Sequence, residues 1–467
     1  MAEKQEKSEK NSSVIDLQSV TASNAKLTEA GYQKENGING NHNEVYDPFS
    51  NRDTQHRTSD FGALVHLFKG SFGSGILAVP RAFMNSGLIL GIFGTVVIGI
   101  ICAHCVSILV KCSHILSIRD KKPSLGFSDT AEVAFKTGPT GLRKYSKLAG
   151  QFVTLSLFAT YYLGNTVYVV LIAQAFQEVF NTYFHILLPI RWYILIVAVP
   201  LLPLGIGRRL KYLVPVSAFG AIFIIFGIVV TFAYALKDLP SIEERKLVNT
   251  VDHLPVFVST ILFAMEGIGT VLPIENSMKH PDHFRGYCGV LSISMSFIIA
   301  MYGVIGFFGY LKYGDKTEAN ITLNLPEDPL SIAVKLMVAL SILFTYGLQF
   351  CVPSEIVWNR LKPSVSAKYE TSAYYVMRGS MIIGTVIIAL IIPNLAPFIS
   401  LVGSVCLSIL GLWTPAMIEL VTYWEEDTGY WRVVKNIFIM VCSIGALIFG
   451  SYTSIIDIIS YYTGVHE

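Results

Sequence analysis

Charged residues are scarce in this chain of 467 residues. Asp, Glu, Lys and Arg make up only 15% of it, whereas 52% of the residues are hydrophobic and the mean hydropathy is +0.53. Soluble domains usually carry about 25% charged residues, so a chain this poor in charge needs an apolar solvent around it. The scarcity excludes an ordinary soluble protein and predicts one embedded in the lipid bilayer.

Cysteines and enzyme motifs are also few. His104 lies between Cys102 and Cys105, but a zinc site would need two further ligands at matching depth, and small buried thiols explain the pair better. We find no disulfide framework, no HExxH metal motif, no phosphate-binding loop and no nucleophile elbow. The sequence therefore predicts no catalytic residue and no metal site. A channel is disfavoured as well, because no filter-like repeat appears.

The first residues differ from the rest of the chain. Residues 1–59 are rich in Lys, Glu, Asn and Ser and contain few large apolar residues. Such a segment cannot bury a core, so we expect a disordered tail, which the charge pattern described below places in the cytoplasm. No basic region precedes an apolar stretch there, and we expect no cleavable signal peptide.

Residues 60–467 read as a transmembrane domain. Apolar segments of about 20 residues mark membrane helices. The fold class predicted is an all-α polytopic membrane protein with eleven transmembrane helices, of which the fourth is short and interrupted by prolines. The predicted spans are 61–84, 88–110, 147–176, 192–206, 212–236, 255–278, 287–311, 330–352, 374–394, 396–420 and 434–460.

The Lys and Arg residues of the short loops set the orientation. Most of them fall on the cytoplasmic side if the amino terminus lies inside, and an odd number of spans then puts the carboxyl terminus on the outer or luminal side. The tripeptide Asn320-Ile321-Thr322 is a glycosylation sequon in the predicted outer loop between spans seven and eight. Asn320 is thus the predicted glycosylation site.

Two spans are interrupted by glycine and proline. The first contains HLFKGSFGSGILAVP, residues His66–Pro80, and the sixth contains FAMEGIGTVLP, residues Phe263–Pro273. Broken segments at corresponding places of two five-helix halves indicate a transporter with inverted repeats. We place the repeats at about 61–236 and 255–420, with an extra helix at about 434–460. Close helix packing is the alternative reason for these glycines.

A break at membrane depth frees backbone groups that lipid cannot satisfy. The N–H groups freed around Gly70–Gly75 begin a half-helix and suit a carboxylate, with help from the helix dipole. The carbonyl groups freed around Met265–Gly269 suit an ammonium group. Together the two breaks predict a site for an α-amino acid.

The two broken segments also resemble a known family. The stretch HLFKGSFGSGILAVPRAFMNSG resembles the first-helix signature of the proton-coupled amino-acid transporters in the amino acid/auxin permease group, and AMEGIGTVLPIENSM is similar to the second signature. The resemblance implies a five-plus-five inverted repeat of the amino acid-polyamine-organocation type with broken helices 1 and 6, and an eleventh helix. It further implies that small neutral amino acids move with protons, at the plasma membrane or from lysosomes.

The resemblance assigns roles to individual residues. The signature histidine falls on His66, which would couple transport to protons. The family often has Asn-Ile where this chain has Ser71-Phe72, so the pocket or its selectivity would differ. Some members carry a disulfide between outer loops, for which this chain has no cysteine. The substrate-binding residues implied are Gly70, Ser71, Gly73, Ser74, Gly75, Glu266, Gly267 and Gly269.

Ionisable residues inside spans are usually functional or paired. Glu266 would bind a cation, take a proton or bond the freed backbone. We expect Lys69 either to extend toward the cytoplasm or to pair with Glu266 or Glu275. Lys335 and Glu419, near span ends, are expected to reach water. Asp457 in the last span receives no role.

The leading functional hypothesis is proton symport of small neutral amino acids, of the alanine, glycine and proline class, by alternating access. Protons are the coupling ion, no further cofactor is implied, and no nucleic acid is expected as a partner. Two alternatives stay open. One is sodium-coupled or uncoupled transport, and the other is an amino-acid sensor that signals through its tail with little transport. The preferred amino acid, the choice of membrane and the oligomeric state do not follow from the sequence.

Overall fold

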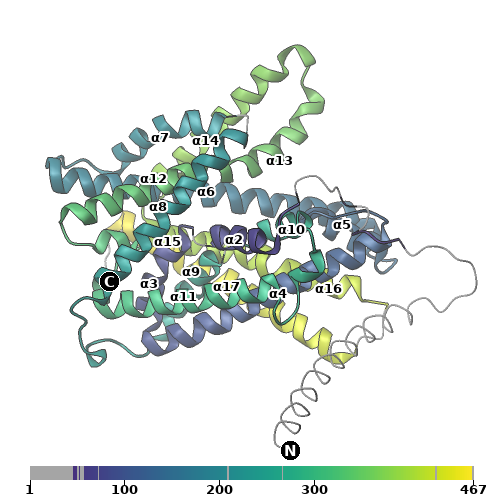
Figure 1. The fold of residues 1–467 in the computed structure, drawn as a ribbon, viewed down its shortest axis with the longest axis horizontal. Coiled ribbons are helices and arrows are strands. Elements are labelled where there is room, and N and C mark those ends of the chain that lie inside the picture. Colours follow the sequence, from purple (N-terminus) through teal and green to yellow (C-terminus); the bar gives the residue numbers. More distant parts are fainter. Residues whose placement is uncertain are drawn as a thin grey trace, which may run out of the picture. The chain divides into compact units, whose positions relative to one another are not determined.

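The computed structural model describes residues 46–49, 52, 57–71, 73–207, 210–265, 267–425 and 429–464, with the side chains of 210–217 excepted. It falls into two units, Met1–Tyr46 and Asp47–Glu467. The second unit carries all the helices discussed below (Figure 1).

The regular secondary structure in the described part of this second unit consists of helices and one isolated β-bridge between Thr58 and Met278. The long elements are α2 (Asp60–Ser71), α3 (Gly75–Ser86), α4 (Leu88–Arg119), α5 (Phe127–Thr137), α6 (Ser146–Phe184), α7 (Ile190–Ile206), α8 (Leu210–Leu236), α9 (Leu254–Ala264), α10 (Ile268–Asn276), α11 (Val290–Tyr313), α12 (Pro329–Gln349), α13 (Cys351–Leu361), α14 (Glu370–Ile391), α15 (Leu395–Val402), the π-helix η9 (Gly403–Trp413), α16 (Thr414–Thr422) and α17 (Tyr430–Thr463). Short 3₁₀ turns are η1 (Arg143–Tyr145), η2 (Ile242–Glu244), η3 (Val251–His253), η4 (Pro281–Phe284), η5 (Gly314–Lys316), η6 (Ile321–Asn324), η7 (Lys362–Ser364) and η8 (Ala367–Tyr369).

Within the described ranges, nine helical runs are long and apolar enough to cross a membrane, and the bent pair α2 and α3 raises the number to ten. The predicted fourth span, 192–206, falls on α7, which is apolar but has only 17 residues. Prolines at 200 and 203 lie inside this helix. The all-helical membrane class is confirmed, whereas the count of eleven spans is not.

Both predicted breaks are present. Helix α2 ends at Ser71 and α3 begins at Gly75, with an angle of 54° between the two helices. Helix α9 ends at Ala264 and α10 begins at Ile268. Glycine costs roughly 1 kcal/mol against alanine inside a helix, so glycine-rich stretches at these points favour ends over continuation.

Close packing around Phe83 fixes the half-helix α3 in the bundle. The Phe83 ring is completely buried, and it lies against Gly91 of α4 and Gly306 of α11. A Cβ atom at Gly91 would lie 2.5 Å from Cδ1 of the ring. A Cβ atom at Gly306 would lie even closer to Cδ2 and Cε2 on the other edge of the ring. These two glycines therefore provide the space into which α3 packs between its neighbours.

Two described residues of the expected tail, Arg52 and Thr58, contact the helical part of the chain. Arg52 is 7% exposed, and Thr58 pairs with the chain that follows α10 through backbone hydrogen bonds to Ser277 and Lys279. The stretch from Asp47 to Ser59 thus belongs to the helical unit as far as it is described, although we predicted a tail up to residue 59. Residues 1–45, 50, 51 and 53–56 of that predicted tail lie outside the described residues.

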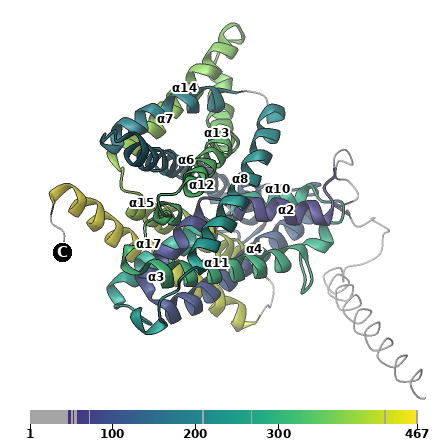
Figure 2. The ribbon, with the colours of Figure 1, turned by 60° about the vertical axis from the view of Figure 1, so that its left-hand side comes forward.

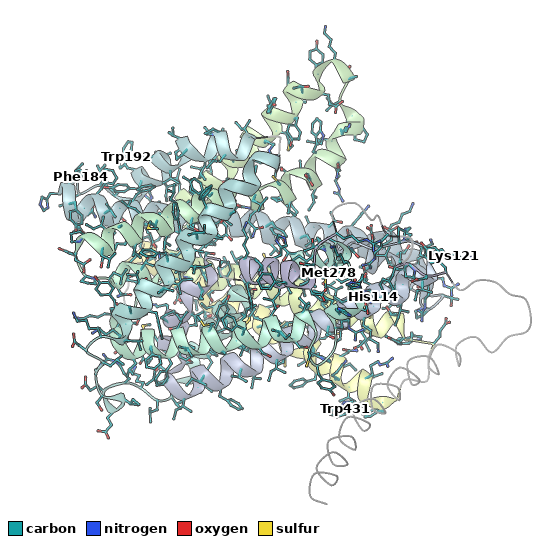
Figure 3. All side chains as sticks on the ribbon, in the orientation of Figure 1. His114, Lys121, Phe184, Trp192, Met278 and Trp431 are labelled. Carbon is teal, nitrogen blue, oxygen red and sulfur yellow. The ribbon has the colours of Figure 1, made fainter. Side chains whose placement is uncertain are left out.

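The helices have two distinct ends. His114, Lys121 and Met278 lie at one end, and Phe184 and Trp192 lie at the opposite one (Figure 3). The first end is the one that the Lys and Arg pattern predicts to be cytoplasmic. Helices α2 and α10 pack against each other in the interior and are adjacent in both ribbon views (Figures 1 and 2).

Candidate functional site

The two helix breaks lie against each other. A Cβ atom at Gly75 would lie 2.6 Å from the Cα of Ala264, so the start of α3 touches the end of α9 backbone to backbone. A Cβ at Gly267 would lie 3.4 Å from the Ser71 hydroxyl oxygen. Glycine is thus required at Gly75 by close approach, and the two breaks form one junction.

Tyr302 of α11 joins the two breaks. Its hydroxyl oxygen lies 2.5 Å from the carbonyl oxygen of Ser71 and 2.8 Å from that of Ala264. These residues end α2 and α9, where carbonyl groups have no partner within their own helix. A hydroxyl carries a single proton, so it donates to one carbonyl at a time and its proton is shared between the two breaks.

A cavity opens beside this junction. The space open to the centres of water molecules is about 30 Å³, and the wider space of about 580 Å³ around it includes the opening to the surroundings. The cavity is mainly apolar, and its polar side chains are Ser71 and Ser294. Because a buried water needs roughly 10–15 Å³ of such space, an amino acid fits only after the walls move apart. The lining residues are Leu67, Ser71, Cys102, Val106, Leu262, Met265, Gly267, Ile268, Val271, Leu291, Ser294, Met295, Ile298, Leu407 and Gly411.

Two tyrosines of α6 flank the breaks. A Cβ at Gly269 would lie 2.6 Å from the Tyr161 hydroxyl oxygen, and one at Gly73 would lie 3.7 Å from that of Tyr168. Tyr162 instead donates to the carbonyl of Met381, 2.8 Å away, and so it serves packing between α6 and α14. Of the neighbouring residues Tyr161 and Tyr162, only Tyr161 reaches the junction.

The predicted substrate residues divide into two groups. Ser71 and Gly267 line the cavity, whereas Gly70, Gly73, Ser74, Gly75 and Gly269 surround the junction without lining it. The Ser74 hydroxyl is buried and has no hydrogen-bond partner among the described residues. Glu266 and Phe72 lie outside the described residues.

His66 does not line the cavity. It is exposed on α2, one helical turn before Gly70 and on the same face. Its ring is therefore open to the surroundings of the helix, while Ala63, Leu67 and Ser71 form the buried face.

Two expectations about buried charges are wrong. Lys335 is 4% exposed and lies 3.5 Å from the Glu178 carboxylate, and Glu419 is 5% exposed with Lys435 at 2.7 Å. Neither reaches water, because neighbouring helices cover the span ends. Glu275 is bonded to Arg52 and His114 rather than to Lys69. Asp457 lies exposed on α17.

Asn320 is 1% exposed. Its side-chain oxygen accepts hydrogen bonds from the Thr322 backbone and hydroxyl, and its side-chain nitrogen is buried without a partner among the described residues. A glycan would have to be attached to this nitrogen. The geometry counts against the glycan predicted at Asn320, which stays a prediction.

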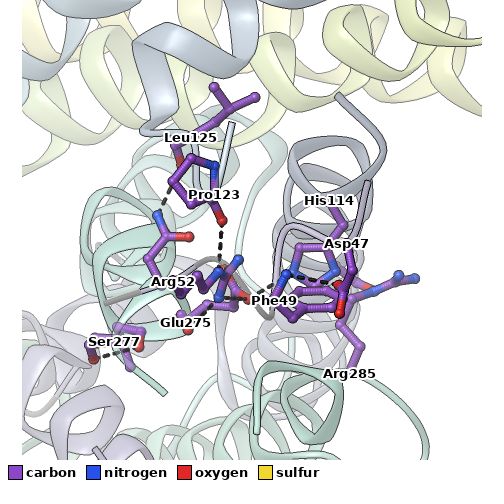
Figure 4. A network of polar contacts seen from close by, with 12 residues as sticks. Asp47, Phe49, Arg52, His114, Pro123, Leu125, Glu275, Ser277 and Arg285 are labelled. Atoms are coloured by element: carbon purple, nitrogen blue, oxygen red, sulfur yellow. Dashed lines mark hydrogen bonds and ion pairs between the residues drawn. The ribbon is translucent and has the colours of Figure 1, made fainter. Parts of the chain in front are cut away.

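Sequence reasoning missed a polar network at the predicted cytoplasmic end. Arg52 and His114 both bond the carboxylate of Glu275 at the end of α10 (Figure 4). The signal in the sequence is an acidic residue near the end of the half-helix that follows the second break, but nothing local indicates its partners. In the part of the chain that is described, no group of three or more His, Cys, Asp and Glu residues could hold a metal ion.

The profile of the transmembrane amino acid transporter proteins matches residues 56–456, which include both breaks. The chain belongs to this family. It is 42% identical over 421 residues to the proton-coupled amino acid transporter-like protein pathetic of Drosophila melanogaster, covering 90% of this chain and 89% of that protein. It is 26% identical over 427 residues to the amino acid transporter ANT1 of Arabidopsis thaliana, covering 86% and 93%. The amino acid/auxin permease membership predicted from the two signatures is confirmed.

The fold is that of solved transporters. A closed conformation of Mhp1, a nucleobase-cation-symport-1 family transporter with bromovinylhydantoin bound, superposes with a TM-score of 0.51 at 14% identity, over 89% of this chain and 94% of that one. The predicted fold class is confirmed, and family and fold alike are those of multi-pass membrane transporters rather than enzymes.

Proposed function

We propose that this amino acid transporter carries small neutral amino acids of the alanine, glycine and proline class together with protons, by alternating access. The observation that carries the proposal is the meeting of both helix breaks at one narrow cavity, lined by Ser71 and Gly267. The relative of 42% identity is named a proton-coupled amino acid transporter-like protein, which supports the same coupling here.

The junction offers complementary groups to an amino acid. The first N–H groups of α3 lack partners in their own helix and favour a carboxylate. The last carbonyl groups of α9, at Ala264 and its neighbours, favour an ammonium group. Gly267, which lines the cavity, allows a ligand to approach the backbone closely. The small cavity favours a small side chain.

Protons are the coupling ion that the junction supports best. Carbonyl groups freed by broken helices can coordinate Na⁺ in transporters. The Tyr302 hydroxyl donates to the carbonyl of Ser71 or of Ala264, one at a time, and the other stays available to the ammonium group, so that Na⁺ would have to compete with both. We assign proton coupling to His66, which is exposed on α2 and close to the first break, because histidine is a residue type that serves as a proton carrier in proteins.

The test is uptake of labelled alanine, glycine and proline at acidic and neutral outer pH, with and without sodium. We expect uptake that is stimulated by acid, independent of sodium and lost in His66→Ala. The control is His185→Asn, which changes an exposed histidine after α6 whose φ of 51° asparagine tolerates. Uptake that requires sodium would favour the sodium-coupled alternative. Binding of alanine without uptake, with the protein at the cell surface, would favour a sensor.

We further propose that the amino terminus is cytoplasmic and that the protein resides in the plasma membrane or a lysosomal membrane. The Lys and Arg pattern of the loops supports this orientation. Epitope tags at the two termini, probed before and after permeabilisation, test it. A tag before residue 46 that is accessible in intact cells with surface protein would reverse the orientation.

A further inference from the structure

Glu275 is the completely buried carboxylate at the end of the half-helix α10. Its Oε1 lies 3.0 Å from a terminal guanidinium nitrogen of Arg52 and 2.7 Å from Nε2 of His114 (Figure 4). An ionised carboxylate only accepts hydrogen bonds, so the His114 bond requires the proton on Nε2. A buried carboxylate is retained only when it is paired in this way.

Three separate parts of the chain meet at this carboxylate. Glu275 is the penultimate residue of α10, His114 belongs to α4, and Arg52 precedes the first helix of the bundle. Arg52 also donates from Nε to the carbonyl of Pro123, 3.0 Å away in the turn after α4. The Arg52 guanidinium also lies over the ring of Phe49. That ring is edge-on to the His114 ring, with the two ring centroids 5.0 Å apart.

The segment before α2 holds the end of α10 through its backbone as well. The N–H of Thr58 donates to the Ser277 carbonyl at 2.7 Å, and the N–H of Lys279 donates to the Thr58 carbonyl at 2.9 Å. Next to Glu275, Asn276 donates to the Leu125 carbonyl at 3.0 Å. The end of α10 is thus bonded to both the segment before α2 and the α4–α5 turn.

The other end of α10 forms the cavity. Ile268, its first residue, and Val271 both line the cavity beside the second break. With nine residues, α10 is a rod of about 13 Å at 1.5 Å per residue. Contacts at Glu275 therefore act on the cavity wall through one short rigid element.

We propose that Arg52, His114 and Glu275 form a latch that holds α10 and closes the cavity toward the cytoplasm, with Arg52 as a positioning residue. Opening of the cavity on that side requires α10 to part from α4 and from the segment before α2, and the bonds of Glu275 break at that step. The latch rests on the proposed function, because closing a pathway matters only to a protein that moves a substrate.

Cys102 is a native reporter of this step. It lines the cavity and is 9% exposed. In a full-length chain in which Cys102 is the only cysteine, a membrane-impermeant thiol reagent is applied to the cytoplasmic face of inside-out vesicles. We expect slow labelling of the wild-type sequence and labelling several times faster in Arg52→Ala and in Glu275→Gln. Arg52→Lys retains a positive charge and should restore much of the slow rate.

Two variants keep the test decisive. Arg143→Ala removes a half-exposed arginine from the same end of the helices and should leave the rate unchanged. Thr58→Pro removes the N–H that bonds Ser277 and should also accelerate labelling, which decides the matter if Arg52→Ala fails to fold. Unchanged labelling in folded Arg52→Ala and Thr58→Pro would overturn the latch.

Labelling needs no substrate, so the latch and the proposed function fail separately. Acid-stimulated uptake combined with labelling that is indifferent to Arg52 overturns the latch and leaves the transport proposal intact. Labelling that depends on Arg52 in vesicles without any amino acid uptake supports the latch and overturns the transport proposal.

Discussion

The hydroxyl oxygen of Tyr302 lies 2.5 Å from the carbonyl oxygen of Ser71, the residue on which α2 ends. Because the same hydroxyl lies 2.8 Å from the Ala264 carbonyl, α11 is bonded to both broken helices at the point where they meet. Relative motion of α2 and α9 must change at least one of these contacts. Tyr302 is thus placed to respond whenever the junction opens.

Replacing Tyr302 with phenylalanine tests this arrangement. The variant removes the hydroxyl donor that the two buried carbonyl groups share. We expect this loss to cost about 1–3 kcal/mol of folding stability. We expect a lower melting temperature in detergent and a reduced maximal rate of alanine uptake. Tyr313→Phe makes the same change at the last residue of α11 and should alter neither. Unchanged uptake and stability in Tyr302→Phe would show that the bridge is dispensable.

Glycine substitutions distinguish backbone contact from simple flexibility. A Cβ at Gly75 would lie 2.6 Å from the Ala264 Cα, whereas one at Gly70 would lie 3.5 Å from the Thr270 side chain, an ordinary contact. We expect Gly75→Ala to force the breaks apart, at a cost of about 1–3 kcal/mol or more, and to abolish uptake. Gly70→Ala should retain surface expression and most of its stability. Equal loss of expression in both variants would contradict the steric argument.

The sequence predicted those features of the fold that local residues determine. Glycine and proline spacing located both breaks, because a helix is weakened where its own residues disfavour it. Apolar segment lengths located most of the spans. Helix α7 was predicted as a short span interrupted by prolines. Its 17 residues are fewer than a membrane span usually has, and so apolar length alone does not identify it as one.

Contacts between distant parts of the chain were beyond sequence reasoning. Tyr302 is one of many tyrosines in apolar segments, and no local pattern marks it as the partner of Ser71. Arg52 lies in a polar stretch that composition alone describes as disordered. Lys335 and Glu419 were expected in water, because a span end shows its length but not which neighbouring helix covers it.

The pair formed by His283 and Asp60 predicts a pH dependence of stability. His283 follows α10, and its Nδ1 donates to the Asp60 carboxylate 2.8 Å away, which raises the pKa of this exposed histidine. A raised pKa in the folded state means that the pair stabilises fully below the unfolded pKa of about 6.5 and that this contribution is lost as pH rises through the folded pKa. We expect a small decline in melting temperature as pH rises above about 6.5, and we expect His283→Gln to remove this decline. An identical pH profile in the variant would contradict the pairing.

The buried pair of Glu419 and Lys435 joins α16 to α17. The carboxylate is 5% exposed and also accepts from Asn436 at 2.8 Å. Removing one partner of a buried ion pair leaves the other charge uncompensated, which is more costly than removing both. We expect Glu419→Gln to lower the free energy of unfolding by about 1–3 kcal/mol, because Gln still bonds Asn436 while Lys435 loses its counter-charge.

A double-mutant cycle with Lys435→Met isolates the pair. If the two charges interact as the 2.7 Å separation indicates, the double variant should be less destabilised than the sum of the single variants, with a coupling of about 0.5–3 kcal/mol. The half-exposed pair of Lys362 and Glu370, 3.3 Å apart, provides the comparison, for which we expect a coupling of about 0.2–1 kcal/mol. Equal coupling in both cycles would mean that burial of Glu419 adds nothing. A larger value for Glu419 would instead show that this end of the last helix is fixed to the bundle by a desolvated charge.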